Sequence, residues 1–206
     1  ESGGPIGEFN GSNNPTADDS VLTANSITAP DGTNNGWKLT DDNDGGSGSS
    51  NIRYGGTQVT SDNSNTFSVF LKKGSTDFAY LRTINYDTSA NGATYFNLST
   101  GAISSASVYH SDVKMEDYGN GWYRCTIAYK TTTDVQGRFD IGIATTSGSR
   151  NITRDGSNFL YLFGIQAVTD SDTDIDSLLV SYIPTSGATV TRSADAANNA
   201  GNRDLF

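Results

Sequence analysis

Glutamate is almost missing from this chain, which contains only Glu1, Glu8 and Glu116 among its 206 residues. Glutamate is one of the better helix formers, whereas glycine, which occurs 23 times, is one of the worst. No stretch shows a convincing helical period. The composition therefore disfavours long helices and favours strands joined by turns.

Cysteine and histidine each occur once, as Cys125 and His110. A single cysteine excludes an intrachain disulfide, and one of each supplies too few sulfur and nitrogen ligands for an ordinary zinc site. Cys125 lies inside an alternating strand pattern, where we expect a small core residue rather than a nucleophile.

Basic residues are also scarce. The 13 Lys and Arg residues against 23 Asp and Glu residues give a net charge of -10 and a pI near 4.3. Nucleic-acid-binding proteins usually present a basic face, so we expect no nucleic-acid partner. No apolar run approaches membrane-spanning length, so we expect no membrane insertion. An acidic surface fits a virion or extracellular location.

Alternating apolar and polar residues predict strands through the middle of the chain. The clearest patterns lie at residues 65–74, 77–87, 93–103, 122–130, 137–145 and 158–168. The last of these is nearly all apolar and is expected to be a central strand. We expect residues 41–50 to form an exposed, flexible loop and residues 51–56 a short edge strand. At least seven short strands separated by turn signals predict an all-β antiparallel sandwich.

One domain is expected, since the chain shows no internal repeat and no change in composition that would mark a second domain. We place it at residues 15–195, after a flexible segment at 1–14 and before a tail or linker at 196–206.

The stretch DYGNGWYRCTIAY, residues 117–129, joins a glycine-rich turn directly to an aromatic pair. Gly119, Asn120 and Gly121 tolerate positive φ and predict a tight turn. Trp122 then enters a strand, and we expect its indole to close one end of the sandwich core. A ligand-stacking role for Trp122 is the alternative.

An ordered set of motifs extends this pattern: ITAPDGTNNGWKLT, TFSVFLKKG, FNLSTGAI, YGNGWYRC, LYLFGIQ and SYIPTSGATVTRSAD. In this order they resemble a family of domains common in bacteriophage virion and tail proteins, similar to concanavalin-like carbohydrate-binding modules. The resemblance covers about residues 15–195 and implies a jelly-roll with a non-catalytic, glycan-facing or virion-structural role. The acidic segment at 169–179 and the Asp-rich loop at 41–46 depart from that family.

The sequence offers little for catalysis. A glycosidase needs two carboxylates across the scissile bond, and the best local pair is Glu116–Asp117, which we expect to be exposed loop acids. The one histidine, His110, is expected to be solvated rather than catalytic. We therefore expect that the chain is not an enzyme. A polysaccharide lyase or a glycosidase on the same fold is the alternative.

Sugar recognition uses aromatic faces together with planar amide, carboxylate and guanidinium groups. Several predicted strands carry such side chains, and the candidate glycan-binding residues are Tyr80, Arg82, Tyr86, Tyr95, Asn97, Arg138, Asp140, Gln166 and Trp37. If their strands share a sheet, the outward residues form one platform. In the alternative, Tyr80 and Tyr86 belong to the core and Arg138 pairs with Asp140 on a solvated face.

Calcium is the cofactor that the sequence suggests, because hard cations bind several oxygens. Asp170, Asp172, Asp174 and Asp176 alternate, so an extended segment would place all four carboxylates on one face. In a loop they would simply be solvated. The aspartates at 41–44 resemble the first half of a calcium loop but lack its final glutamate.

These observations lead to three hypotheses. The first is a non-catalytic carbohydrate-binding module of a phage virion, which binds a polysaccharide or cell-surface glycan weakly and gains avidity as a homo-oligomer. The second is a purely structural virion domain that contacts other virion protein subunits. The third is the polysaccharide-degrading enzyme.

Overall fold

The computed structural model describes residues 16–59, 64–84, 91–133 and 135–170. This part of the chain contains strands and no helix, so it offers no helical segment that could cross a membrane. The strands are β1 (Thr16–Asp18), β2 (Ser20–Ile27), β3 (Gly36–Asp41), β4 (Ser47–Gly48), β5 (Asn51–Val59), β6 (Ser64–Lys73), β7 (Phe78–Ile84), β8 (Gly92–Asn97), β9 (Ala102–Ser105), β10 (Asp112–Asp117), β11 (Trp122–Tyr129), β12 (Val135–Ala144), β13 (Ile152–Thr153) and β14 (Phe159–Asp170).

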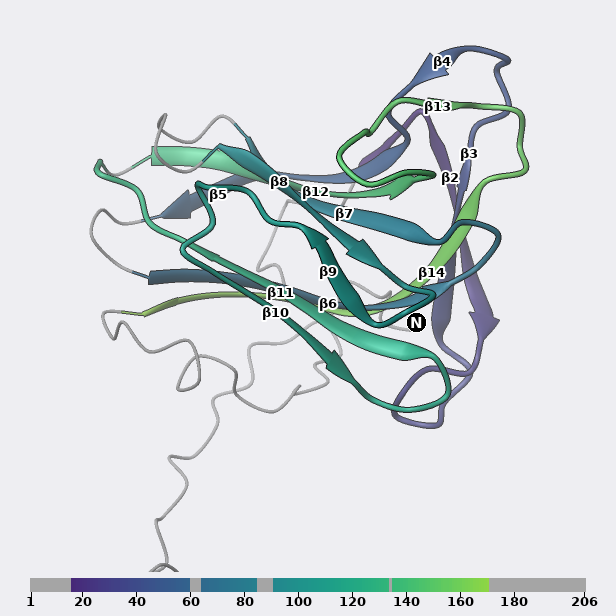
Figure 1. Ribbon diagram of the computed structural model, residues 1–206, viewed down its shortest axis with the longest axis horizontal. Helices are drawn as coiled ribbons and strands as arrows, with labels where there is room; N and C mark the ends of the chain where they lie inside the picture. Colours follow the sequence, from purple (N-terminus) through teal and green to yellow (C-terminus); the bar gives the residue numbers. More distant parts are fainter. Residues whose placement is uncertain (1–15, 60–63, 85–90, 134, 171–206) are drawn as a thin grey trace, which may run out of the picture.

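Two six-stranded antiparallel sheets pack face to face (Figure 1). The first sheet has the order β1-β5-β12-β7-β8-β9 and the second has the order β10-β11-β6-β14-β3-β2. The pairing is nested, because β3 pairs with β14, β5 with β12, β6 with β11, and β7 with β8. A long hairpin rolled up in this way is a jelly-roll. The predicted all-β antiparallel sandwich is confirmed.

The core lies between the sheets and is built from the alternating residues of both. Its buried members include Phe67, Val69 and Leu71 of β6, Cys125, Ile127 and Tyr129 of β11, and Phe139, Ile141 and Ile143 of β12. The rings of Phe67 and Phe139 stack across the two sheets with centroids 4.3 Å apart. The faces expected from the alternation in these strands are therefore confirmed.

β14 lies between β6 and β3, so the prediction of a central strand is confirmed. Its register against β6 shifts between Phe163 and Gln166, where Gly164 has a φ of 58°. This bulge lets Leu162 and Ile165, three residues apart, both belong to the core.

One local expectation was wrong, and a second was right only for the exposed residues 43–45 and 47. β5 is a nine-residue strand that lies between β1 and β12, not a short edge strand. The segment 41–50 contains β4 and begins and ends on buried residues, Asp41 and Ser50. The predicted terminal segments at 1–14 and 196–206 lie outside the described residues, so the domain boundaries stay predictions.

Candidate functional site

The glycine-rich turn joins β10 to β11 and has the expected backbone. Gly119, Asn120 and Gly121 have φ values of 80°, 52° and 78°. The backbone N–H of Trp122 donates to the Gly119 carbonyl at 2.9 Å, and the Asp117 carboxylate accepts from the Gly119 N–H at 2.7 Å. Three successive residues in the left-handed region explain why two glycines and an asparagine occur here.

The sequence suggested that Trp122 closes one end of the main core, and this expectation was wrong. Its indole packs on the outer face of the second sheet in a separate buried cluster with Ala29, Phe70 and Phe163. The indole N–H donates to the Thr28 carbonyl at 3.1 Å. Trp122 thus pins the loop between β2 and β3 onto the outer face of that sheet. A cavity of about 280 Å³ opens beside it, lined by residues 27–30, Lys72, 118–120 and Trp122.

The outer face of the first sheet carries most of the predicted glycan-binding residues. Strand register arranges them in two rows. One row, the arginine row, holds Arg53 of β5, Asp140 of β12 and Arg82 of β7. The adjacent row, the tyrosine row, holds Asn51, Gly142, Tyr80 and Tyr95 on the same strands and β8. The strands β7, β8 and β12 share one sheet, as the platform hypothesis required.

Asp140 is the centre of the arginine row and its side chain is fully buried. Its Oδ2 accepts from Arg82 Nε at 2.7 Å and from a second guanidinium nitrogen of Arg82. Arg138, two residues earlier on β12, places its Nε 3.2 Å from Asp140 Oδ1. That contact is an ion pair without hydrogen-bond alignment, because both of these buried atoms lack a hydrogen-bond partner. Arg138 pairs with Asp140, as the alternative to the platform hypothesis expected.

The tyrosine row is more deeply buried than a sugar platform would be. Tyr80 is fully buried and its hydroxyl donates to Asn51 Oδ1 at 3.1 Å. Tyr95 is 6% exposed and lies beside Arg150 from the loop after β12. Burial raises the pKa of both phenols, so both rings are neutral at pH 7. As the structure stands, neither tyrosine presents an open ring face to a sugar.

The other predicted glycan-binding residues lie elsewhere. Asn97 ends β8, where its side chain accepts the N–H groups of Ser99 and Thr100 at 2.9 and 3.1 Å. Gln166 lies on β14 in the second sheet and accepts from Arg124 at 3.0 Å. Trp37 of β3, also in the second sheet, packs against the main core. Tyr86 lies outside the described residues.

Sequence reasoning missed three residues of the outer face: Asn51, Arg53 and Arg150. Alternation in the stretch NIRY puts Asn51 and Arg53 on one face, opposite Ile52 and Tyr54, and that signal was available. Their position beside Asp140 depends on the pairing of β5 with β12, which the sequence does not state.

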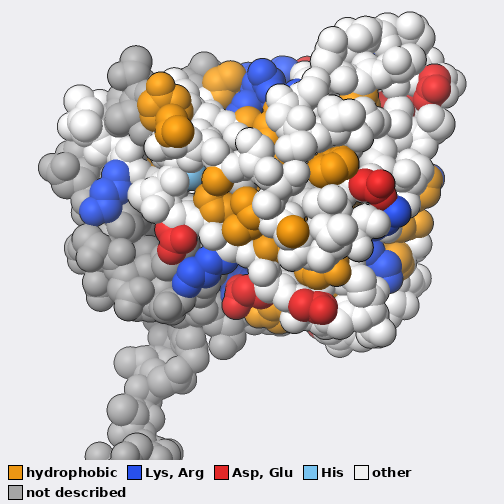
Figure 2. Space-filling model, viewed as in Figure 1, with side chains coloured by type: hydrophobic (Ala, Val, Ile, Leu, Met, Phe, Trp, Pro, Cys, Tyr) orange, Lys and Arg blue, Asp and Glu red, His pale blue; other side chains and the backbone are white. Residues whose placement is uncertain are grey.

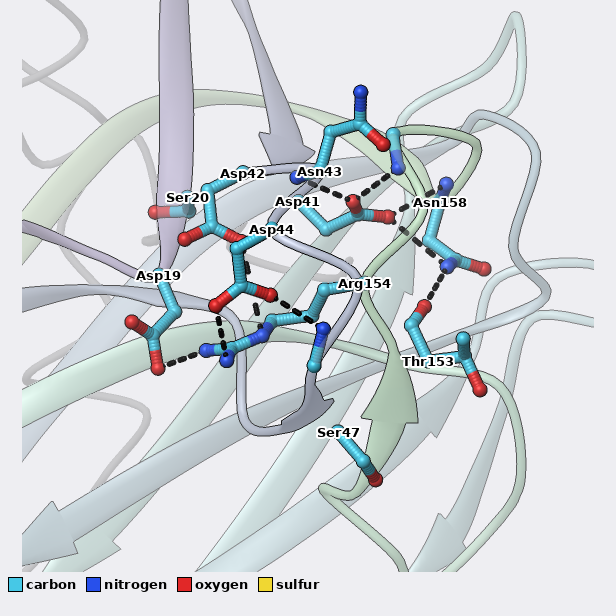
Figure 3. Close-up of polar contacts among 12 residues, drawn as sticks. Asp19, Ser20, Asp41, Asp42, Asn43, Asp44, Ser47, Thr153, Arg154 and Asn158 are labelled. Carbon is cyan, nitrogen blue, oxygen red and sulfur yellow. Dashed lines mark hydrogen bonds and ion pairs between the residues drawn. The ribbon is translucent and has the colours of Figure 1, made fainter.

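Two of the aspartates at 41–44, Asp42 and Asp44, surround an arginine together with Asp19 (Figure 3). Arg154 forms ion pairs with Asp44 at 2.7 Å, with Asp42 at 3.7 Å and with Asp19 at closer range. Its guanidinium supplies the positive charge that a calcium ion would otherwise bring to these carboxylates. Asp41 is separate and buried, and accepts backbone N–H groups of Gly156 and Asn158 at 2.5 and 3.0 Å.

The main predicted calcium ligands cannot be placed. Asp172, Asp174 and Asp176 lie outside the described residues, and Asp170 is described only as the last residue of β14. Within the described ranges, no group of three or more His, Cys, Asp or Glu side chains is arranged to hold a metal ion.

The candidate catalytic groups are separated. Contrary to expectation, His110 is buried, with its Nδ1 2.7 Å from Thr94 Oγ1 and its Nε2 3.0 Å from Thr83 Oγ1. Burial lowers the pKa of His110 to about 4, so it is neutral at pH 7. Glu116 and Asp117 are exposed, as expected, but they are the last two residues of strand β10 rather than loop residues.

No protein-family model matches the chain, and no curated protein sequence matches it. Among solved structures, one similar to it is the enzymatically active domain of tailspike protein 4 from bacteriophage CBA120, with 10% sequence identity and a TM-score of 0.43. The match covers 76% of this chain and 19% of the tailspike chain. That structure is described as part of a phage tailspike, and no family model for concanavalin-like carbohydrate-binding modules matches the chain.

The same comparison contradicts the expectation that the chain is not an enzyme, because the similar structure is described as enzymatically active. At 10% identity, the likeness names no reaction for this chain. Since the chain spans about a fifth of the tailspike's length, that protein's activity as a whole is not transferred to it.

Proposed function

We propose that this chain is a glycan-recognition domain of a virion-associated protein and that it binds its glycan on the outer face of the first sheet. The observation that carries the proposal is the arginine row, in which Arg53 and Arg82 flank the buried Asp140 on adjacent strands. Planar guanidinium and carboxylate groups in fixed positions are suited to sugar hydroxyls. The virion setting is supported by the ordered sequence motifs.

The geometry supports a mechanism based on hydrogen bonds more than on stacking. The ring of Tyr80 is fully buried and that of Tyr95 almost so, whereas the side chains of Arg53 and Arg138 are 34% and 23% exposed. A bound sugar would therefore meet the partly exposed guanidinium groups of Arg53 and Arg138 before the buried tyrosine rings.

The test is a glycan array of the purified chain, with calcium and with a chelator. We expect saturable binding to one class of glycan that is lost in Arg138→Ala and weakened in Arg150→Ala. The control is Lys73→Ala, which removes an exposed lysine at the end of β6. Absence of binding to every glycan in both conditions would refute the proposal. Loss of binding with the chelator alone would direct attention to the predicted calcium ligands Asp170, Asp172, Asp174 and Asp176.

A structural role in the virion is the second candidate, and one observation favours it. The edge strand β9 is exposed along its whole length, and the loop after it exposes Val108 by 90% and Tyr109 by 46%. Ile103 on β9 is 41% exposed. Figure 2 shows hydrophobic side chains on the face where Figure 1 places β9. An unpaired edge beside apolar side chains is suited to contact with another subunit.

The two candidates separate in solution. If β9 contacts a second copy of this chain, light scattering should show an oligomer that Val108→Lys converts to monomers, with glycan binding per chain unchanged. If the chain is a monomer at all concentrations, the hypothesis that β9 contacts a second copy of the chain is wrong.

A further inference from the structure

We infer that the glycan bound on the outer face of the first sheet is acidic, and that Arg138 binds its carboxylate. The inference rests on the proposed function and names the class of ligand. It starts from charge: the chain as a whole carries a net charge of -10, yet this face concentrates arginines.

Four arginines belong to the face: Arg53, Arg82, Arg138 and Arg150. The acids paired with them are Asp140, which is shared by Arg82 and Arg138, and Asp18, which pairs with Arg53. Four positive charges against two negative ones leave this face positive on a strongly acidic molecule. A glycan with negative charge would be attracted here and repelled by most of the remaining surface.

Arg138 is the arginine best placed to take the carboxylate. Arg82 is committed to Asp140 through two of its nitrogens and is only 11% exposed. Arg138 is 23% exposed and meets Asp140 through one unaligned contact at 3.2 Å, which leaves the outer end of its guanidinium for a ligand. The planar fork of a guanidinium matches a carboxylate with two parallel hydrogen bonds.

Asp140 gives the site its preference for a sugar over a simple anion. Its Oδ1 is fully buried beside Arg138 and has no hydrogen-bond partner, so it can accept a hydroxyl next to the bound carboxylate only when the Arg138 side chain turns outward to meet the ligand. A uronic acid, which carries hydroxyls beside its carboxylate, supplies both groups. An anion without hydroxyls would leave Oδ1 without a hydrogen bond.

The experiment compares each acidic polysaccharide with its own neutral form. Polygalacturonate, alginate, hyaluronan and any acidic glycan bound on the array are tested by calorimetry before and after their carboxylates are reduced to alcohols by carbodiimide and borohydride. Dextran sulfate is tested alongside them as a polysaccharide whose negative charge comes from sulfate instead of carboxylate. We expect binding to a carboxylated form, a loss of about 10- to 100-fold after reduction, and further weakening as salt rises from 50 to about 500 mM.

Variants tie this preference to the residue. Arg138→Gln should lower affinity for the carboxylated glycan about 10- to 100-fold, and Arg138→Lys should restore only part of it because lysine lacks the fork. Lys73→Gln, which removes one positive charge elsewhere, should change affinity less than twofold. Because Arg82 still pairs with Asp140 in these variants, the fold should persist, which circular dichroism checks.

The outcomes keep the two proposals apart. Equal binding of reduced and unreduced glycans, or binding of neutral glycans on the array, overturns the acidic ligand and leaves glycan recognition standing. If dextran sulfate is the sole polysaccharide that binds, the inference that the ligand group is a carboxylate is wrong. No binding on the array or by calorimetry overturns both.

Discussion

Tyr80 lies across Gly142 on the neighbouring strand, so that the glycine provides the floor on which the tyrosine ring rests. A Cβ on Gly142 would overlap the end of that ring. The hydroxyl passes over β12 and reaches Asn51 on β5, which ties three strands of the first sheet together on their outer face. The proposed glycan site is built beside this contact, so its shape depends on a glycine.

Gly142→Ala should therefore destabilise the fold and disturb the site. The added methyl must displace Tyr80 and break its hydrogen bond with Asn51, which we expect to lower the free energy of unfolding by about 1–3 kcal/mol. Urea unfolding followed by tryptophan fluorescence measures the change. Gly48→Ala is the control, because a Cβ there meets only ordinary contacts with Arg154 at 3.8 Å or more. Equal stability of the two variants would show that Tyr80 does not need the space.

Alternation predicted the strands of this molecule well because burial between two sheets imposes a period of two. It separated the core residues Leu81 and Ile141 from the outer residues Arg82 and Asp140. It could not supply register, which depends on which strands meet. The pairing of Arg53 with the Asp140 row, and the placement of Gln166 in the opposite sheet, follow from the nested topology alone.

Polar contacts between residues far apart in the chain also could not be predicted from the sequence. Asp44 and Arg154 are 110 residues apart, and nothing in either segment signals that they meet. From the sequence alone, the acidic stretch at 41–46 therefore indicates a flexible loop or part of a calcium loop. The burial of His110 could not be predicted for the same reason. It depends on contacts with two threonines from β7 and β8 that are distant in the sequence.

Arg154→Met should make the stability of the fold depend on calcium. Methionine keeps much of the bulk but leaves Asp19, Asp42 and Asp44 facing one another without a positive charge. We expect a lower melting temperature without metal and a recovery when millimolar calcium is added. The carboxylates are not arranged for a metal while Arg154 is present, but the exposed side chains of Asp19 and Asp44 can turn toward a hard cation once the guanidinium is gone.

The matched control for this variant is Arg154→Lys, which keeps the charge and should respond to calcium no more than the parent chain. Thermal unfolding with calcium and with chelator gives the comparison. A variant whose melting temperature ignores calcium would show that the three carboxylates separate into solvent once the arginine is gone.

In the turn after β10, Gly119 should be required only because of its backbone conformation and not because a side chain would clash. Gly119 has a φ of 80° and a Cβ there would meet no atom within 4 Å, so Gly119→Ala adds strain without a clash. We expect a loss of about 1–2 kcal/mol in the free energy of unfolding. Gly119→Asn should lose clearly less, because asparagine tolerates the left-handed region. Equal losses in the two variants would point to a cause other than backbone conformation.

His110 should make stability fall with acid. Its pKa is about 4 in the folded chain because of burial, against an ordinary value of 6.5, so the unfolded chain binds a proton at a pH where the folded chain does not. The stability that comes from keeping His110 neutral is fully present above about pH 6.5 and is lost as the pH falls through 4, a total loss of about 3 kcal/mol.

The measurement is a double difference, because aspartates also titrate in this range. The free energy of unfolding is compared at pH 7 and pH 4.5 for the parent chain and for His110→Gln, whose side chain carries no charge at either pH. The parent should lose more stability than the variant. As His110 is the one histidine in the sequence, its proton resonance in an NMR titration is unambiguous. A midpoint near 6.5 would mean that the imidazole is open to solvent, and the pH effect on stability should then be the same in both chains.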